Sequence, residues 1–158
     1  MQVGNVEYVS TEAIEDLLAG PGRVVPVIAP IGVGKGKDGQ IEKYNINADW
    51  AATQIAIAVH ARKLIFLTDQ EGVLDHNREL ITKARPSLMR MCIEQGVIAG
   101  GMMTKVNAMI AAVNAGVGQV RVLNAASAGL LLTNDKIGTL LTGDIMTNKR
   151  GVLHERAS

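Results

Sequence analysis

Two short stretches of the chain combine residue types that could handle a phosphate group. Residues 44–49 read Tyr-Asn-Ile-Asn-Ala-Asp, which offers two amides and a carboxylate at the start of an expected helix. Residues 100–105 read Gly-Gly-Met-Met-Thr-Lys, a glycine-rich turn followed by a lysine in the first turn of another helix. Packing requires neither arrangement. Together the two stretches predict a site for a phosphorylated ligand.

Lys105 is the most informative residue of these two stretches about a phosphate site. In a first helical turn it opposes the positive end of the helix dipole, which costs about 0.3–1 kcal/mol. One interpretation is a solvated lysine that tolerates this cost. The other is a bound polyanion, whose oxygens would accept from the N–H groups of Gly100 and Gly101 while the ammonium neutralises the transferring charge.

The polar residues of the first stretch also have two interpretations. Asn47 suits the cap position of the following helix, and Asp49 in its first turn is favourable for the dipole. Alternatively, Asp49 orients cationic groups around a phosphoryl transfer, and the amides of Asn45 and Asn47 grip a substrate carboxylate. The residues alone leave both possibilities open.

The elements that would position these residues alternate between apolar runs and one-faced helical patterns. This alternation predicts an α/β fold, a three-layer α/β/α sandwich with a mainly parallel sheet. Strands are expected at residues 24–29, 64–67, 120–123 and, at an edge, 137–141, with a ribbon of 31–33 and 40–44 around Asp38-Gly39. Helices are expected near residues 12–18, 48–61, 86–95, 102–115 and 126–132.

Three loops then fall at the carboxyl ends of strands, where open α/β sheets bind ligands. They are residues 30–34, 68–72 and 124–127. The loop before Lys105 can join them. Such convergence is what a nucleotide pocket needs.

Composition narrows the class of function. The 158 residues carry a net charge of +1 and only 3% aromatics, so neither a basic surface nor a stacking platform for nucleic acid is expected. The lone Cys92 is expected to be buried and inert, and the three histidines form no metal-ligand pattern. Without an apolar run of membrane-spanning length, a cytoplasmic protein is expected. Residues 1–147 are expected to form one domain, and 148–158 a flexible tail.

Four segments resemble the N-acetylglutamate kinase branch of the amino-acid kinase family. They are residues 26–32, 44–49, 67–75 (Leu-Thr-Asp-Gln-Glu-Gly-Val-Leu-Asp) and 100–106. The similarity runs over roughly residues 3–141. It covers only the carboxyl-terminal, nucleotide-binding half of the family pattern.

The resemblance implies transfer of the γ-phosphoryl group of ATP to the side-chain carboxylate of N-acetyl-L-glutamate, in arginine biosynthesis. Mg²⁺ would come with the nucleotide, and no protein metal ligands are expected. Asp49 would organise the catalytic lysines, Lys105 would neutralise the phosphoryl group, and Asn45 and Asn47 would bind the acceptor. The ATP site would be lined by Thr68, Asp69, Gln70, Glu71, Gly72, Val73, Gly100, Gly101, Met102 and Lys105.

In the family, the other half carries a glycine-rich substrate loop, an arginine that grips the substrate and a second catalytic lysine. The resemblance therefore implies weak binding of MgATP and little kinase activity for this chain alone. A separate amino-terminal half, or self-association, would supply the partner. The alternative is a catalytically silent nucleotide-binding or regulatory module that acts with another protein.

Overall fold

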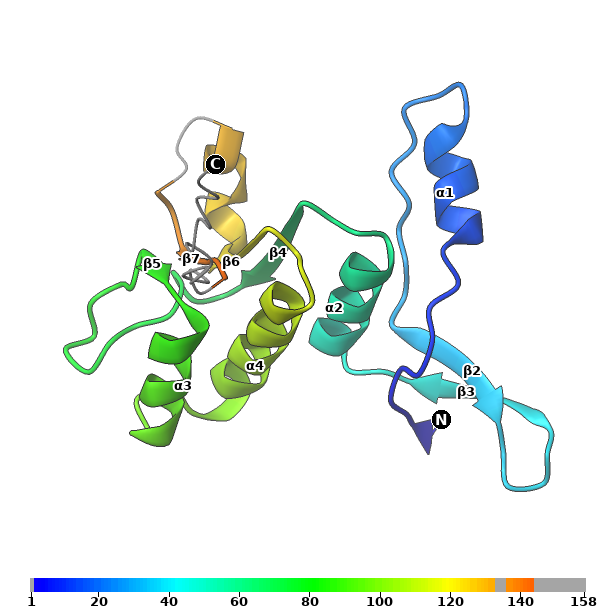
Figure 1. The fold of residues 1–158 in the computed structure, drawn as a ribbon, viewed down its shortest axis with the longest axis horizontal. Coiled ribbons are helices and arrows are strands. Elements are labelled where there is room, and N and C mark those ends of the chain that lie inside the picture. The colour runs from blue at the N-terminus through cyan, green and yellow to red at the C-terminus, as the bar shows by residue number, and fades with distance from the viewer. Residues whose placement is uncertain (1, 133–135, 144–158) are drawn as a thin grey trace, which may run out of the picture.

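The structure is a computed structural model that describes residues 2–132 and 136–143, so the predicted tail lies outside the described residues. Its strands form two separate sheets, joined in the chain by helix α2 (Ala48–Ala58) (Figure 1). A three-stranded sheet contains β1 (Gln2–Val3), β2 (Ile31–Lys35) and β3 (Ile41–Asn45). A four-stranded sheet contains β4 (Lys63–Thr68), β5 (Lys83–Ala84), β6 (Gln119–Asn124) and β7 (Thr139–Leu141).

The hydrophobic core lies between the four-stranded sheet and a layer of helices. Helices α2 and α4 (Gly100–Asn114) contact each other, and α3 (Pro86–Glu94) packs on α4. Helix α2 also contacts β4, and α4 contacts β6 and β7. Alternate strand residues point into this core, among them Phe66, Val120 and Val122. Cys92 on α3 is buried as a free thiol, as expected. None of the helices among the described residues is long and apolar enough to cross a membrane.

The order of the four-stranded sheet is β4-β6-β7-β5. Strands β4 and β6 are parallel, as are β5 and β7, whereas β6 and β7 are antiparallel. The predicted α/β class with a mainly parallel sheet is confirmed. The prediction that residues 137–141 form an edge strand is wrong, because β5 pairs with the outer side of β7. The two residues of β5 are too few to give an apolar pattern that the sequence could reveal.

The predicted ribbon is confirmed as the antiparallel pair β2 and β3, with β1 added in parallel on β3. Asp38 and Gly39 lie in its turn, where Asp38 Oδ1 accepts from the N–H of Gln40 at 3.0 Å and Gly39 has φ +80°. A left-handed φ of this kind favours glycine. The hairpin places Asn45, at the end of β3, just before the start of α2.

The predicted buried strand at residues 24–29 is absent, which is a correction to the sequence analysis. The segment is extended, but among the described residues no strand pairs with it, and Val25 and Val27 are 84% and 96% exposed. A β-branched run becomes a strand only when a neighbour satisfies its backbone groups. Pro26 also lacks the N–H that one edge would donate.

The exposure of this segment extends to its surroundings. Residues 3–45 contain no buried side chain, and helix α1 (Glu12–Ala19) buries none of its residues. Figure 1 shows α1 and the three-stranded sheet standing to one side of the helices and the four-stranded sheet. The first part of the chain therefore folds without a hydrophobic core of its own.

Candidate active site

The centre of the candidate site is an ion pair between two helices. The ammonium of Lys105 on α4 donates to Oδ1 of Asp49 on α2, with Nζ and Oδ1 2.6 Å apart. Both side chains are largely covered, at 15% exposure for Lys105 and 21% for Asp49. Charge-assisted hydrogen bonds of this length are stronger than neutral ones. The structure thus brings together the two residues that the sequence analysis assigned to catalysis.

Two further contacts surround the ion pair. Its Nζ lies 5.3 Å from the centroid of the Phe66 ring on β4, within the range of a cation–π interaction. The buried hydroxyl of Thr53 on α2 donates to the carbonyl of Ala108 on α4 at 3.4 Å, which ties the two helices together beside the ion pair. The pair is therefore held between two helices and a strand.

The position of Lys105 within its helix differs from the expectation. Helix α4 begins at Gly100 rather than at Met102, so Lys105 lies in its second turn. The dipole effect falls off within the first turn, so the expected cost of this cation is largely absent. The functional interpretation of Lys105 then depends on its contacts with Asp49 and Phe66.

Asn47 occupies the cap position of α2. Its side-chain Oδ1 accepts from the N–H groups of Asp49 and Trp50, at 3.0 and 3.2 Å. The capping interpretation is confirmed, and the amide nitrogen of Asn47 is left for another partner. Asn45 is exposed at the end of β3, where its carbonyl accepts from the N–H of Gly4 at 3.1 Å.

The end of β4 and the loop that follows it contain six of the predicted nucleotide-binding residues. Thr68, Asp69, Gln70 and Glu71 lie at the surface or near it, and the hydroxyl of Thr68 donates to Oδ1 of Asp69 at 3.2 Å. Val73 is instead buried in the hydrophobic core. Its N–H donates to Oγ1 of Thr139 at 2.8 Å, so Val73 anchors the loop to β7.

Gly72 is required where this loop meets β7. Its φ is +154°, and a Cβ atom there would lie 2.7 Å from both Leu80 Cδ1 and Thr139 Oγ1. Any larger residue would have to displace the loop or the strand. This close approach explains the glycine that the sequence analysis assigned only to nucleotide binding.

Asn124 is a residue of this site that the sequence analysis did not select individually. Its amide nitrogen donates to the carbonyl of Asp69 at 3.3 Å and to Oε1 of Glu71 at 2.8 Å. Asn124 therefore holds the loop after β4 to the end of β6. The signal was present in the sequence, because Thr68 and Asn124 end two strands that pair in register.

The glycines at the start of α4 face open space. A Cβ atom at Gly100 or Gly101 would meet nothing within 4 Å, and Ala99 gives the helix no side-chain cap. The first N–H groups of α4 are therefore not covered by a capping side chain, as an anion-binding turn requires. Met102 differs from its neighbours, because its side chain packs against the core.

The chain belongs to the amino acid kinase family, whose profile matches residues 1–124. It is 42% identical over 140 residues to the acetylglutamate kinase of Bacillus thuringiensis, a match that covers 89% of this chain and 52% of that relative. The chain thus spans about half the length of the curated relatives that it matches.

Two solved structures share the fold. The crystal structure of smu.665 from Streptococcus mutans aligns with a TM-score of 0.71 and 35% identity, over 90% of this chain and 51% of that one. The N-acetylglutamate synthase of Neisseria gonorrhoeae, complexed with coenzyme A and L-arginine, aligns with a TM-score of 0.62 and 26% identity. That match covers 73% of this chain and 27% of the synthase.

Proposed function

We propose that this chain is the ATP-binding part of an N-acetyl-L-glutamate kinase. The complete enzyme would transfer the γ-phosphoryl group of ATP to the side-chain carboxylate of N-acetylglutamate, a step of arginine biosynthesis in the cytoplasm. The relatives named acetylglutamate kinase support this assignment. So does one observation of the structure, the ion pair between Lys105 and Asp49.

The proposal gives each partner of the pair a separate task. Asp49 holds the ammonium of Lys105 in a fixed position through their 2.6 Å contact. Lys105 neutralises negative charge on the γ-phosphoryl group as it moves between the two oxygens. Such transfers depend on positioning and charge stabilisation, so a fixed ammonium is more effective than a mobile one.

The residues around the pair fit a nucleotide. The uncapped N–H groups of Gly100 and Gly101 would bind phosphate oxygens, and the exposed loop of Thr68, Asp69, Gln70 and Glu71 would line the nucleotide site with Val73 as its anchor. Mg²⁺ would be held by the phosphates that it accompanies. Asn45 and the free amide nitrogen of Asn47 would bind the acceptor.

The proposal also explains the exposed surface of residues 3–45. We propose that residues 1–147 act as one nucleotide-binding domain and that this surface docks against the other half of the kinase, supplied by a second polypeptide or by self-association. Apolar residues such as Val25, Val27 and Ile41, which are each at least 80% exposed, would be covered there. Alone, the chain would bind MgATP weakly and turn over little.

Calorimetric titration with MgATP tests the nucleotide site. K105Q is expected to weaken binding at least about tenfold, a difference of about 1.4 kcal/mol. K43Q serves as the matched control, because Lys43 is an exposed lysine on β3 and should bind as the unmodified chain does. Equal affinity in the K105Q variant would remove the basis of the proposal.

Adding the missing part of the kinase as a second polypeptide tests whether N-acetylglutamate is the phosphoryl acceptor. Phosphorylation of N-acetylglutamate should be near background for the chain alone. It should rise when the part of the Bacillus thuringiensis relative that this chain does not match is supplied as a second polypeptide. Normal turnover by the chain alone would contradict the predicted inactivity.

A silent regulatory module is the second candidate, and one observation favours it. A domain of this fold forms part of a synthase, of which the matched region is 27%. MgATP binding that never responds to N-acetylglutamate, even with the second polypeptide present, would favour the regulatory module over the kinase.

A further inference from the structure

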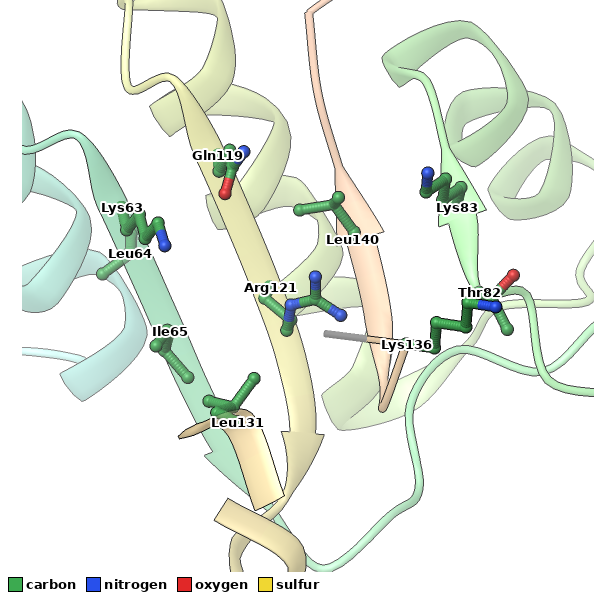
Figure 2. A pocket seen from close by; sticks show the side chains of 10 residues that line it. All are labelled: Lys63, Leu64, Ile65, Thr82, Lys83, Gln119, Arg121, Leu131, Lys136 and Leu140. Carbon is green, nitrogen blue, oxygen red and sulfur yellow. The ribbon is translucent and has the colours of Figure 1, made fainter. Parts of the chain in front are cut away.

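The face of the four-stranded sheet that lies opposite the helices contains a pocket unrelated to the candidate active site. Its volume is about 660 Å³, within the range of small-molecule sites. Figure 2 shows side chains from all four strands directed into it. The segment η1 (Ala125–Leu132) reaches the same space through Leu131.

Strand register explains why these residues meet. Ile65 pairs with Arg121, Arg121 pairs with Leu140, and Leu140 pairs with Lys83, so one row crosses all four strands. Side chains of paired residues point to the same face. The residues next to them along the strands, such as Phe66 and Val122, point to the opposite face and form the core. The register of the four strands therefore places the side chains of this row together on one face of the sheet.

The charge of the pocket is one-sided. Four of the ten residues that line it are cationic, and none is acidic: the cations are Lys63, Lys83, Arg121 and Lys136. The whole chain carries a net charge of only +1, so this is a local concentration of positive charge. Within the described residues, no carboxylate forms a salt bridge with Lys63, Lys83 or Arg121.

Arg121 gives the pocket a fixed cation. It is 92% buried, with 8% of its surface exposed, and its Nη1 donates to the carbonyl of Ile137 at 2.5 Å. One hydrogen bond uses only one of the five donors of a guanidinium. Placing a guanidinium here without a carboxylate is unfavourable unless solvent or an anion completes its contacts.

We propose that this pocket binds a small organic polyanion that carries phosphate or carboxylate groups on a partly apolar body. Lys63, Lys83 and Arg121 would bind the charged groups. Ile65, Leu131 and Leu140 would contact the apolar part.

The pocket is separate from the nucleotide site. Lys63 and Thr68 begin and end β4, which places them about 17 Å apart along the strand. Arg121 also lies on the face of the sheet opposite to Phe66 and the ammonium of Lys105. Ligands at the two sites can therefore be distinguished by which variants affect them.

Methyl NMR of the chain, labelled at isoleucine and leucine, tests the proposal. Citrate and pyrophosphate serve as probes of the two anion types, with sodium chloride at matched ionic strength as the reference. At least one probe should shift the methyl signals of Ile65 and Leu140 in a saturable way. In a K63Q/K83Q double variant, this binding should be about tenfold weaker, because two cations have been removed.

Two controls make the result specific. K43Q, an exposed lysine on β3, should leave the affinity unchanged, and K105Q should affect only signals near the nucleotide site. Lys63 and Lys83 are exposed, so the double variant should retain its melting temperature in the absence of probe. The proposal is overturned if neither probe exceeds the chloride effect at Ile65 and Leu140, or if the double variant binds as tightly as the unmodified chain.

Discussion

Lys105 Nζ lies 2.6 Å from Asp49 Oδ1, although 56 residues separate the two in sequence. The contact joins the first turn of α2 to the second turn of α4. Neither helix needs it for packing, because their apolar faces already meet and Thr53 links them nearby. We therefore attribute to this contact the role of fixing the position of a positive charge.

A double-mutant cycle with D49N and K105Q should reveal this coupling. Each single change is expected to destabilise the fold by about 1–2 kcal/mol, because it leaves a largely covered charge without its partner. The double change should cost less than the sum, with a coupling of about 1 kcal/mol. Urea unfolding measures all four variants. Strict additivity would mean that the two side chains do not interact in solution.

Two substitutions of Asn47 can separate its capping role from its proposed role in binding the acceptor. N47A should cost about 1 kcal/mol, because it removes the oxygen that accepts from the N–H groups of Asp49 and Trp50. N47D keeps that oxygen and should retain stability in thermal unfolding. It loses the amide donor, so the complemented enzyme should bind N-acetylglutamate more weakly. Unchanged acceptor affinity would leave capping as the whole role of Asn47.

Gly72 should tolerate no side chain. G72A would place a Cβ atom 2.7 Å from Leu80 and Thr139, and a destabilisation of about 1–3 kcal/mol is expected. G101A is the matched control for stability, because a Cβ atom there meets nothing within 4 Å. Denaturant midpoints compare the two. If G72A is as stable as G101A, the loop after β4 is able to move away from β7.

Tyr44 provides a prediction about pH. Desolvation, and then the nearby carboxylate of Glu42, raise the pKa of its phenol above the ordinary value of 10.0. Because the folded-state pKa is the higher one, the resulting stability is complete below pH 10.0 and is lost as pH rises through the folded-state value. Phenolate absorbance in a Y8F background reports Tyr44 alone. E42Q should lower this pKa, and an unchanged or higher pKa would exclude Glu42 as a cause.

Local sequence patterns were sufficient to predict much of the fold. The Asp38-Gly39 turn predicted the β2–β3 hairpin, and the Asn47 cap predicted the start of α2. The same patterns placed Asp49 and Lys105 near helix starts, from which their meeting could be proposed. These features depend on residues close in sequence, so no knowledge of tertiary contacts was needed.

Apart from the start of α4, the failures concern partners distant in sequence. Residues 24–29 have the composition of a buried strand, but whether a strand forms depends on a neighbour that the composition does not specify. β7 was placed at an edge because the two-residue β5 beside it has no pattern. Asn124 went unselected because its bonds to Asp69 and Glu71 depend on register between β4 and β6.

The position of β7 between β6 and β5 has a consequence for synthesis. In the described sheet, β5 pairs only with β7, which is made more than fifty residues later. In a nascent chain that has emerged as far as α4, residues 83–84 therefore have no strand to pair with. The sheet can be completed only after the ribosome has released residues 139–141, and until then α3 and α4 cover an unfinished surface that a chaperone is suited to protect.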